Sequence, residues 1–255
     1  MLEVDNVSVV FGGLTAVKEL SFTVEPGRIV GLIGPNGAGK TTVFNAILGV
    51  YPPTSGEVRL EGQRIDRLPT HRIARLGLGR TFQNIRLFRN MSVLDNVKVA
   101  LNRQYRYSLA DALLRTPRCR RREREIYAEA RRILEFFGLA DVARNPAASL
   151  PYGKQKYLEI ARAYAVKPRM LLLDEPAAGL NDTETSSLMD KVQEIMRTTG
   201  CGVLLIEHDM HLVMGICEFI VVIDYGAKIS EGTAEHVQND PRVIEAYLGV
   251  KEVRE

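Results

Sequence analysis

The chain has 255 residues, 45% hydrophobic and 25% charged, and its 34 Lys and Arg against 31 Asp and Glu give a net charge of +3. This composition excludes a globally disordered chain, and no apolar run approaches the roughly 18–20 residues that span a bilayer. The first residues lack the pattern of a secretory signal, and the three cysteines lack metal-ligand spacing, so we expect a protein of the reducing cytosol. A charge of +3 is too weak to indicate a partner.

Short apolar segments open the chain. Apolar residues alternate imperfectly over residues 2–9 and 20–24, as in strands with one buried face. The nearly continuous apolar run over residues 28–33 suits a strand buried on both faces. A glycine-rich segment follows, and then a helix over residues 40–48, which Gly49 ends.

The pattern becomes helical over residues 84–167. Ser92 is a suitable N-cap for a helix that carries Asp95 in its first turn. Apolar residues then recur at three- and four-residue steps over residues 126–137 and again over residues 158–164. We therefore expect three helices in this stretch.

Strand-sized apolar runs resume at residues 170–173, 202–206 and 219–223, and a helix is predicted over residues 183–197 between the first two. Alternating strands and helices indicate an α/β fold with a mainly parallel sheet.

We therefore divide the chain into a core and an insertion. The core comprises residues 1–83 and 168–255 and begins with an antiparallel β part. The insertion is an α-helical subdomain of residues 84–167.

A glycine-rich sequence after the strand at residues 28–33 fits the pattern G-x-x-x-x-G-K-[ST]. Its glycines would let backbone N–H groups wrap phosphate oxygens, and the following helix adds the positive end of its dipole. Lys40 would reach the β- and γ-phosphates, and the Thr41 hydroxyl would bind Mg²⁺. A chance glycine-rich turn is the alternative, which the strand–helix context disfavours. We predict a P-loop NTPase core that binds nucleotide through Gly34, Pro35, Asn36, Gly37, Ala38, Gly39, Lys40, Thr41 and Thr42.

Two carboxylates follow the apolar run at residues 170–173, where open α/β sheets bind their ligands. Asp174 would hold Mg²⁺ through water, next to Thr41. Glu175 would orient and polarise the attacking water as general base. An acidic turn that closes a strand is the alternative, but nucleotide hydrolysis needs both kinds of group.

Two further residues are weaker candidates by themselves. His208 follows the strand at residues 202–206, which should neighbour the Asp174 strand and bring the imidazole near the γ-phosphate. A lone histidine after a strand is more often structural. Gln83 has a neutral donor and acceptor head after a short strand and would be unremarkable alone.

Together these motifs resemble those of ATP-binding cassette (ABC) ATPases, over essentially the whole chain. The resemblance implies that Phe11 stacks on adenine, although an ordinary core aromatic is the alternative. It implies that Gln83 is the Q-loop glutamine, which senses Mg²⁺ and transmits motion to a membrane partner, and that His208 is the switch histidine. The implied catalytic residues are Glu175, His208, Gln83 and Lys40, and the implied ligands of Mg²⁺ are Thr41, Gln83 and Asp174.

Residues 150–155, Leu-Pro-Tyr-Gly-Lys-Gln, occupy the position of the family's signature motif, which usually reads Leu-Ser-Gly-Gly-Gln. Pro151 replaces the serine and has neither a hydroxyl nor an N–H for the γ-phosphate of an opposing subunit. Tyr152 replaces the first glycine. Gly153 and the following helix N-terminus keep an anion site in trans. We expect slower or differently tuned hydrolysis with Glu175 still supporting turnover.

Residues 178–181 match the family's D-loop, with Asn181 in place of the usual aspartate, so hydrogen bonding is kept and charge is lost. The resemblance also implies a head-to-tail dimer that buries two ATP molecules, each between the glycine loop of one cassette and the signature of a second, identical or different cassette.

A closer resemblance is to LivG-type subunits of branched-chain amino acid importers. It is carried by residues 11–17, 80–96, 152–153, 176–181 and 207–210. It implies an energy-coupling ATPase bound peripherally on the cytoplasmic face of the inner membrane, with transmembrane permeases and, indirectly, an extracytoplasmic solute-binding protein. Other cargoes (urea, amides, lipopolysaccharide export) stay open. A soluble cassette acting on nucleic acid or ribosomes is a further alternative, but we expect no nucleic acid partner.

Six arginines lie between residues 115 and 124. They suit a solvated helix face paired with Glu123 and Glu125, or a surface for anionic lipid or a transporter loop. Nucleic acid is the least favoured alternative, because the near-neutral chain lacks a wider basic face.

Three apolar residues follow Gln83 closely: Ile85, Leu87 and Phe88. Exposed apolar residues beside a sensor glutamine would suit a partner groove, so we expect them to grip a helix of the membrane partner.

Overall fold

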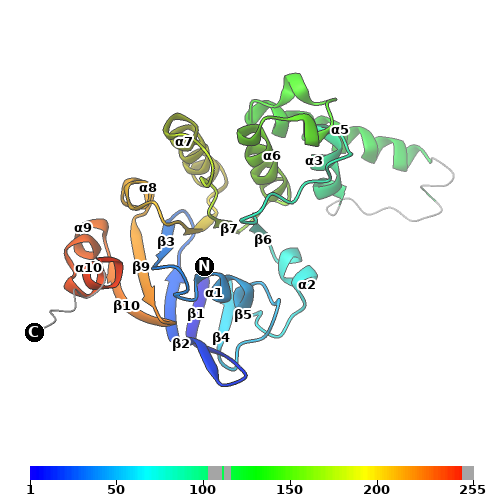
Figure 1. The fold of residues 1–255 in the computed structure, drawn as a ribbon. Helices are drawn as coiled ribbons and strands as arrows, with labels where there is room; N and C mark the ends of the chain where they lie inside the picture. Colours follow the sequence, from blue (N-terminus) through cyan, green and yellow to red (C-terminus); the bar gives the residue numbers. More distant parts are fainter. Residues whose placement is uncertain (103–110, 112–115, 249–255) are drawn as a thin grey trace, which may run out of the picture. The chain divides into compact units, whose positions relative to one another are not determined.

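The structure is a computed structural model that describes residues 1–102, 111 and 116–248 (Figure 1). It divides into two compact units. The first unit comprises Met1–Leu78, Arg169–Pro176 and Val192–Glu255, and the second comprises Gly79–Pro168 and Ala177–Lys191. The division predicted from the sequence places residues 79–83 and 177–191 with the core, whereas in the structure they belong to the second unit.

A four-stranded antiparallel sheet begins the first unit. Its order is β2-β1-β4-β5, formed by Leu14–Val24, Leu2–Phe11, Ser55–Leu60 and Gln63–Arg64. Val7 and Val9 of β1 are buried while Ser8 between them is partly exposed, which is the period expected of a strand with one core-facing side. The predicted antiparallel β part is confirmed.

A six-stranded sheet forms the centre of the fold, in the order β10-β9-β3-β8-β7-β6. These strands are Ala227–Gly232, Phe219–Asp224, Ile29–Ile33, Gly202–Ile206, Met170–Asp174 and Leu78–Arg80. The pairs β9–β3, β3–β8 and β8–β7 are parallel, and β10 is antiparallel to β9. Every residue of β3, β7 and β8 is buried, as their continuous apolar sequences predict.

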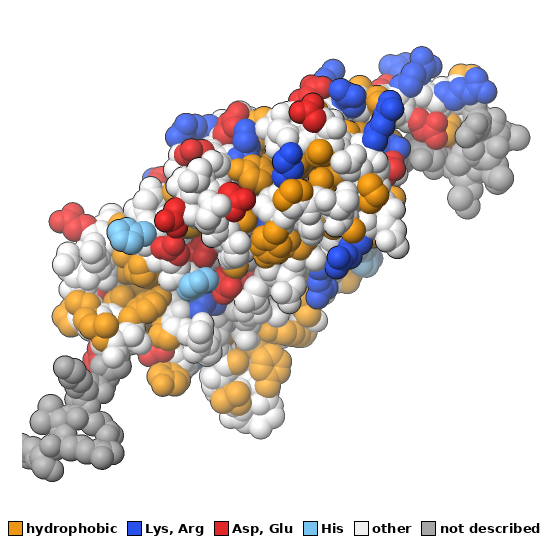
Figure 2. All heavy atoms as spheres, turned by 45° about the horizontal axis from the view of Figure 1, so that its top comes forward, with side chains coloured by type: hydrophobic (Ala, Val, Ile, Leu, Met, Phe, Trp, Pro, Cys, Tyr) orange, Lys and Arg blue, Asp and Glu red, His pale blue; other side chains and the backbone are white. Residues whose placement is uncertain are grey.

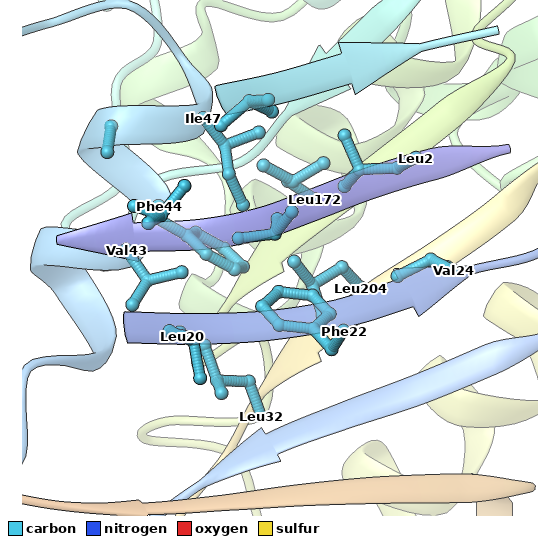
Figure 3. Close-up of a cluster of buried hydrophobic side chains, with 14 of the residues drawn as sticks. Leu2, Leu20, Phe22, Val24, Leu32, Val43, Phe44, Ile47, Leu172 and Leu204 are labelled. Atoms are coloured by element: carbon cyan, nitrogen blue, oxygen red, sulfur yellow. The ribbon is translucent and has the colours of Figure 1, made fainter. Parts of the chain in front are cut away.

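Helix α1 (Lys40–Ile47) joins the two sheets through one hydrophobic cluster. Figure 3 shows side chains of α1 pointing into a cluster that also contains side chains from both sheets, among them Val43, Phe44, Ile47, Leu2, Leu20, Leu172 and Leu204. Phe44 is fully buried, and truncating such a residue to Ala costs about 3–5 kcal/mol of stability. This packing fixes the start of α1 beside the end of β3.

The other helices that lie wholly in the first unit are no longer than α1. They are α2 (Thr70–Arg75), α8 (Met210–Ile216), α9 (Ala234–Asn239) and α10 (Pro241–Leu248). Helix α7 (Asp182–Thr199) is shared, with its first part in the second unit. Among the described residues, no helix is both long enough and apolar enough to cross a membrane.

The second unit is helical, with α3 (Val93–Asn102), α5 (Pro117–Phe136) and α6 (Tyr152–Ala165), and with the short 3₁₀ turns Ala140–Val142 and Ala147–Ser149. The predicted cap of α3 is confirmed. The Ser92 Oγ accepts a hydrogen bond from the Asp95 N–H at 3.0 Å and lies 2.7 Å from the Asp95 carboxylate.

The basic cluster lies on α5, except for Arg115, which is outside the described residues. Figure 2 shows Lys and Arg side chains gathered over this helix. Arg121 and Arg122 hydrogen-bond to Glu125 at 3.0 and 2.9 Å, one helical turn away. These contacts support the interpretation as a solvated helix face.

Candidate nucleotide site

The glycine-rich loop joins β3 to α1 and has a backbone that only glycine can adopt at two positions. Gly34 has φ +155°, and a Cβ there would lie 2.0 Å from the Ile223 carbonyl oxygen. Gly39 has φ +102°, and a Cβ there would lie 2.5 Å from the Ala16 carbonyl oxygen. The two glycines therefore let the loop close tightly around whatever its N–H groups bind.

Lys40 is the first residue of α1 and is 8% exposed. Its Nζ donates to the carbonyl oxygens of Gly34 and Pro35 at 2.6 and 2.9 Å, so the ammonium lies within the loop. Burial lowers the pKa of Lys40, opposed by the negative charges of Glu175 and Asp174. Lys40, at the start of α1, and the two predicted carboxylates, at the end of β7, all belong to the first unit.

Asp174 ends β7 and is 3% exposed, and its Cα pairs with that of Ile206 in β8. Glu175 follows with φ +45°, and its N–H donates to the Ile206 carbonyl oxygen at 3.0 Å. A left-handed backbone at a non-glycine residue costs on the order of 1–3 kcal/mol and tends to occur at functional sites. The strained turn places Glu175 at the carboxyl edge of the sheet.

His208 lies at the same edge, because β8 neighbours β7 as predicted. Its side chain is 60% exposed, and its Nδ1 lies 3.8 Å from an oxygen of Glu207. Glu207 is itself 1% exposed and accepts a hydrogen bond from the His208 N–H at 3.3 Å. Glu207 was not among the site residues predicted from the sequence, although a carboxylate directly after a wholly apolar strand is the signal that identified Asp174.

Phe11 is 46% exposed at the end of β1, and its ring meets that of Tyr51 edge to face at 5.1 Å between centroids. The alternative of an ordinary core aromatic is therefore wrong. An exposed ring offers a face on which a flat base can stack.

The signature position and the D-loop contact each other within the second unit. The Tyr152 hydroxyl donates to the Ala178 carbonyl oxygen at 3.2 Å, and a Cβ on Gly179 would lie 2.9 Å from the Tyr152 ring. Gly153 lies in the first turn of α6, where a Cβ would meet a Glu184 oxygen at 2.9 Å. The tyrosine that departs from the usual signature thus links two predicted motifs.

Asn181 also has a structural role that was not predicted from the sequence. Its Oδ1 accepts from the Glu184 N–H at 2.9 Å, and its N–H donates to the Glu184 carboxylate at 3.2 Å. This reciprocal capping box begins α7. The pattern N-x-x-E before a helix was the available signal.

The predicted site residues are therefore divided between the two units. The first unit contains Phe11, the glycine loop, Lys40, Thr41, Thr42, Asp174, Glu175 and His208, and the second contains Gln83, Gly153 and Asn181. Thr41 and Gln83 are both exposed. No cluster of three or more His, Cys, Asp and Glu residues suited to a metal occurs in the part of the chain that is described. The side chains present fit a Mg²⁺ that takes its other ligands from phosphate and water.

Comparison with known proteins agrees with this geometry. A model of the ABC transporter family matches residues 17–178, and a model described as branched-chain amino acid ATP-binding cassette transporter matches residues 227–253. The chain is 48% identical over 249 residues to the high-affinity branched-chain amino acid transport ATP-binding protein BraF of Pseudomonas aeruginosa, covering 98% of both chains. LivG of Escherichia coli, with the same description, is 47% identical over the same shares.

Among solved structures, the ADP conformation of MJ1267, an ATP-binding cassette of an ABC transporter, has a TM-score of 0.84 and 29% identity, covering 98% of this chain and 99% of that one. The predicted α/β cassette fold is thereby confirmed. With one family model matched over more than half of its length and relatives nearly half identical across 98% of it, this chain belongs to the ABC transporter family and is one of its ATP-hydrolysing cassettes.

Proposed function

We propose that the chain is the energy-coupling ATPase subunit of an importer of branched-chain amino acids. Its near full-length identity of 48% to BraF carries this proposal, together with the match of its last part to the branched-chain amino acid cassette model. The place of Lys40 within the glycine-rich loop, and of Asp174 and Glu175 at the end of β7, supports hydrolysis by the chain itself.

The first unit would bind ATP. The loop N–H groups cradle the phosphates, and the Lys40 ammonium exchanges its carbonyl partners for β- and γ-phosphate oxygens. The exposed face of Phe11 stacks on adenine.

Thr41 and Asp174 would hold Mg²⁺, and the family resemblance adds Gln83 as a further ligand. When bound, the ion neutralises charge that develops on the phosphates. Glu175 takes a proton from the attacking water, and His208 contacts the γ-phosphate and positions that water. The buried Glu207 steadies the backbone at His208 through its hydrogen bond.

The remaining parts of the site would come from a second cassette, whose Gly153 at the start of α6 presents N–H groups to the γ-phosphate. Asn181 caps α7 beside it. Closure on ATP and opening after hydrolysis would drive permeases bound at the cytoplasmic face of the membrane, with solute delivered by an extracytoplasmic binding protein.

The test is to co-purify the native complex, reconstitute it in proteoliposomes and measure which solute stimulates its ATPase. We expect leucine, isoleucine or valine, with the binding protein, to stimulate hydrolysis several-fold, and Lys40→Ala to abolish it. Stimulation by urea, amides or lipopolysaccharide instead would show that the proposed cargo is wrong. A rate of hydrolysis that neither the permeases nor the solute change would contradict energy coupling itself.

A further inference from the structure

The segment that carries Gln83 is held by one helix of its own unit. Residues 81–88 are neither helix nor strand, so their backbone N–H groups need partners outside the segment. The N–H groups of Phe82 and Arg86 both donate to the same Oε1 of Glu159, at 3.3 and 3.2 Å. A single carboxylate oxygen therefore closes a loop of five residues around Gln83.

A second side chain of α6 completes the contact. Arg162, one turn after Glu159, donates to the carbonyl oxygen of Arg86. The N–H and the C=O of Arg86 are thus both bound by α6. The Phe82 ring adds contacts at the other end of the loop, with the Arg80 and Arg86 guanidinium groups 4.1 and 4.6 Å from its centroid.

Burying the Glu159 carboxylate costs free energy, because its charge loses most of its hydration. It is 4% exposed, and burial raises its pKa, opposed by the N–H groups of Arg86 and Phe82. Buried carboxylates are rare because charge is poorly solvated there, so this one is most simply explained by the two N–H groups it binds. It also lines a cavity of about 250 Å³ together with Phe82, Arg86 and Arg162.

We propose that Glu159, assisted by Arg162, is a positioning residue that ties the Gln83 loop to the helix beginning at the signature position. The proposal rests on the proposed function. Because α6 starts at Tyr152, any displacement of the signature is passed directly to both sides of Gln83. The structural consequence for the loop can be measured in the isolated chain, without permeases or cargo.

The first measurement is hydrogen exchange of peptides covering residues 81–88. Glu159→Leu should speed exchange there by about tenfold or more while protection in β3 and β7 is unchanged, because only the loop loses its acceptor. Glu159→Gln keeps an oxygen at the same place and should restore most of the protection. Glu135→Gln, an exposed change on α5, is the matched control. Unchanged exchange in the leucine variant would overturn the proposal.

The second measurement is ATPase activity in the reconstituted complex. Glu159→Leu should reduce the stimulation of kcat by solute about tenfold while the KM for Mg-ATP, set by the glycine loop, stays within about twofold. A fall in kcat matched by an equal weakening of Mg-ATP binding (a higher KM), together with a lower melting temperature, would indicate a purely structural residue. That result would contradict the proposal. If wild-type protein shows no solute stimulation, the proposed function fails, and the exchange measurement still decides the positioning role.

If the leucine variant does not fold, as judged by circular dichroism, Glu159→Asp replaces it. Shortening the side chain by one methylene withdraws the oxygen from both N–H groups and keeps the charge. Faster exchange over residues 81–88 with this variant supports the proposal, and wild-type exchange opposes it.

Discussion

At the scale of the residue, Phe88 is an exposed aromatic on a fixed backbone. Its side chain is 44% exposed, whereas Ile85 and Leu87 are half-buried, so Phe88 is the most exposed of the three predicted contact residues. The fully buried Asn96 accepts from the Phe88 N–H and donates to its carbonyl oxygen, both at 3.0 Å. A side chain held this way can enter a partner groove without first ordering its backbone.

Phe88→Ala should weaken assembly with the permeases about tenfold or more and leave ATP affinity unchanged, because it removes an exposed apolar anchor. Pull-down with purified permeases and nucleotide titration check the two parts. Tyr127→Ala, at a similarly exposed aromatic on α5, is the control and should assemble normally. Normal assembly and transport by the Phe88 variant would contradict the proposal that this side chain binds the partner.

At the scale of the element, Asp66 fastens the short β5 strand to β4. Its carboxylate accepts from the Val58 N–H at 3.2 Å and from the Arg64 Nε at 2.9 Å. Burial alone would raise the pKa of Asp66, but the hydrogen bonds from Arg64 and Val58 and the charge of Arg64 bring it below its ordinary value. The ionised form is therefore bound more tightly in the folded protein than in the unfolded chain.

Asp66→Asn should lower the free energy of unfolding by about 1–2 kcal/mol at pH 7, because hydrogen bonds to a charged acceptor are lost. The wild-type advantage is complete above the unfolded pKa of about 4 and disappears as the pH falls through the lower folded value. Urea melts between pH 7 and pH 3 measure this convergence. An equal difference in unfolding free energy between wild type and variant at pH 7 and at pH 3 would show that charge is not the cause. The exposed Asp141→Asn serves as the reference variant.

At the scale of the whole molecule, the groups proposed for hydrolysis are divided between two compact units. Lys40, Asp174 and Glu175 belong to the first unit, whereas Gly153 belongs to the second. The proposed mechanism uses Gly153 on the nucleotide of another cassette, so the assembly and not the single chain would form the complete site.

Glu175→Gln should bind ATP and accumulate as a dimer with Mg-ATP, because loss of the general base slows hydrolysis by about 10²–10⁴-fold and keeps the closed state. Light scattering with and without Mg-ATP measures the association. Glu123→Gln, at an exposed site on α5, should behave as wild type. A Glu175 variant that binds ATP and stays monomeric would refute the shared site.

Many features of this structure could be predicted from short patterns in the sequence. The glycine loop, the three buried strands β3, β7 and β8 and the Ser92 cap were predictable because each depends on a few consecutive residues. The Asp174–Glu175 pair was identified by its place after an apolar run.

The contacts that join these parts could be found only from the tertiary structure. Glu159 lies 77 residues from Phe82, and Tyr152 lies 26 from Ala178, so no sequence spacing reveals either hydrogen bond. The division of residues 177–191 from the core likewise depends on which surfaces pack together.

The sequence by itself thus determined the phosphate loop and its strand-end carboxylates, because the glycine pattern of the loop and the apolar runs of the strands are local features of the sequence. Only the tertiary structure decided what holds the Gln83 loop, the signature and the D-loop, because a buried polar group must take its partners from whichever distant segment the fold brings to it.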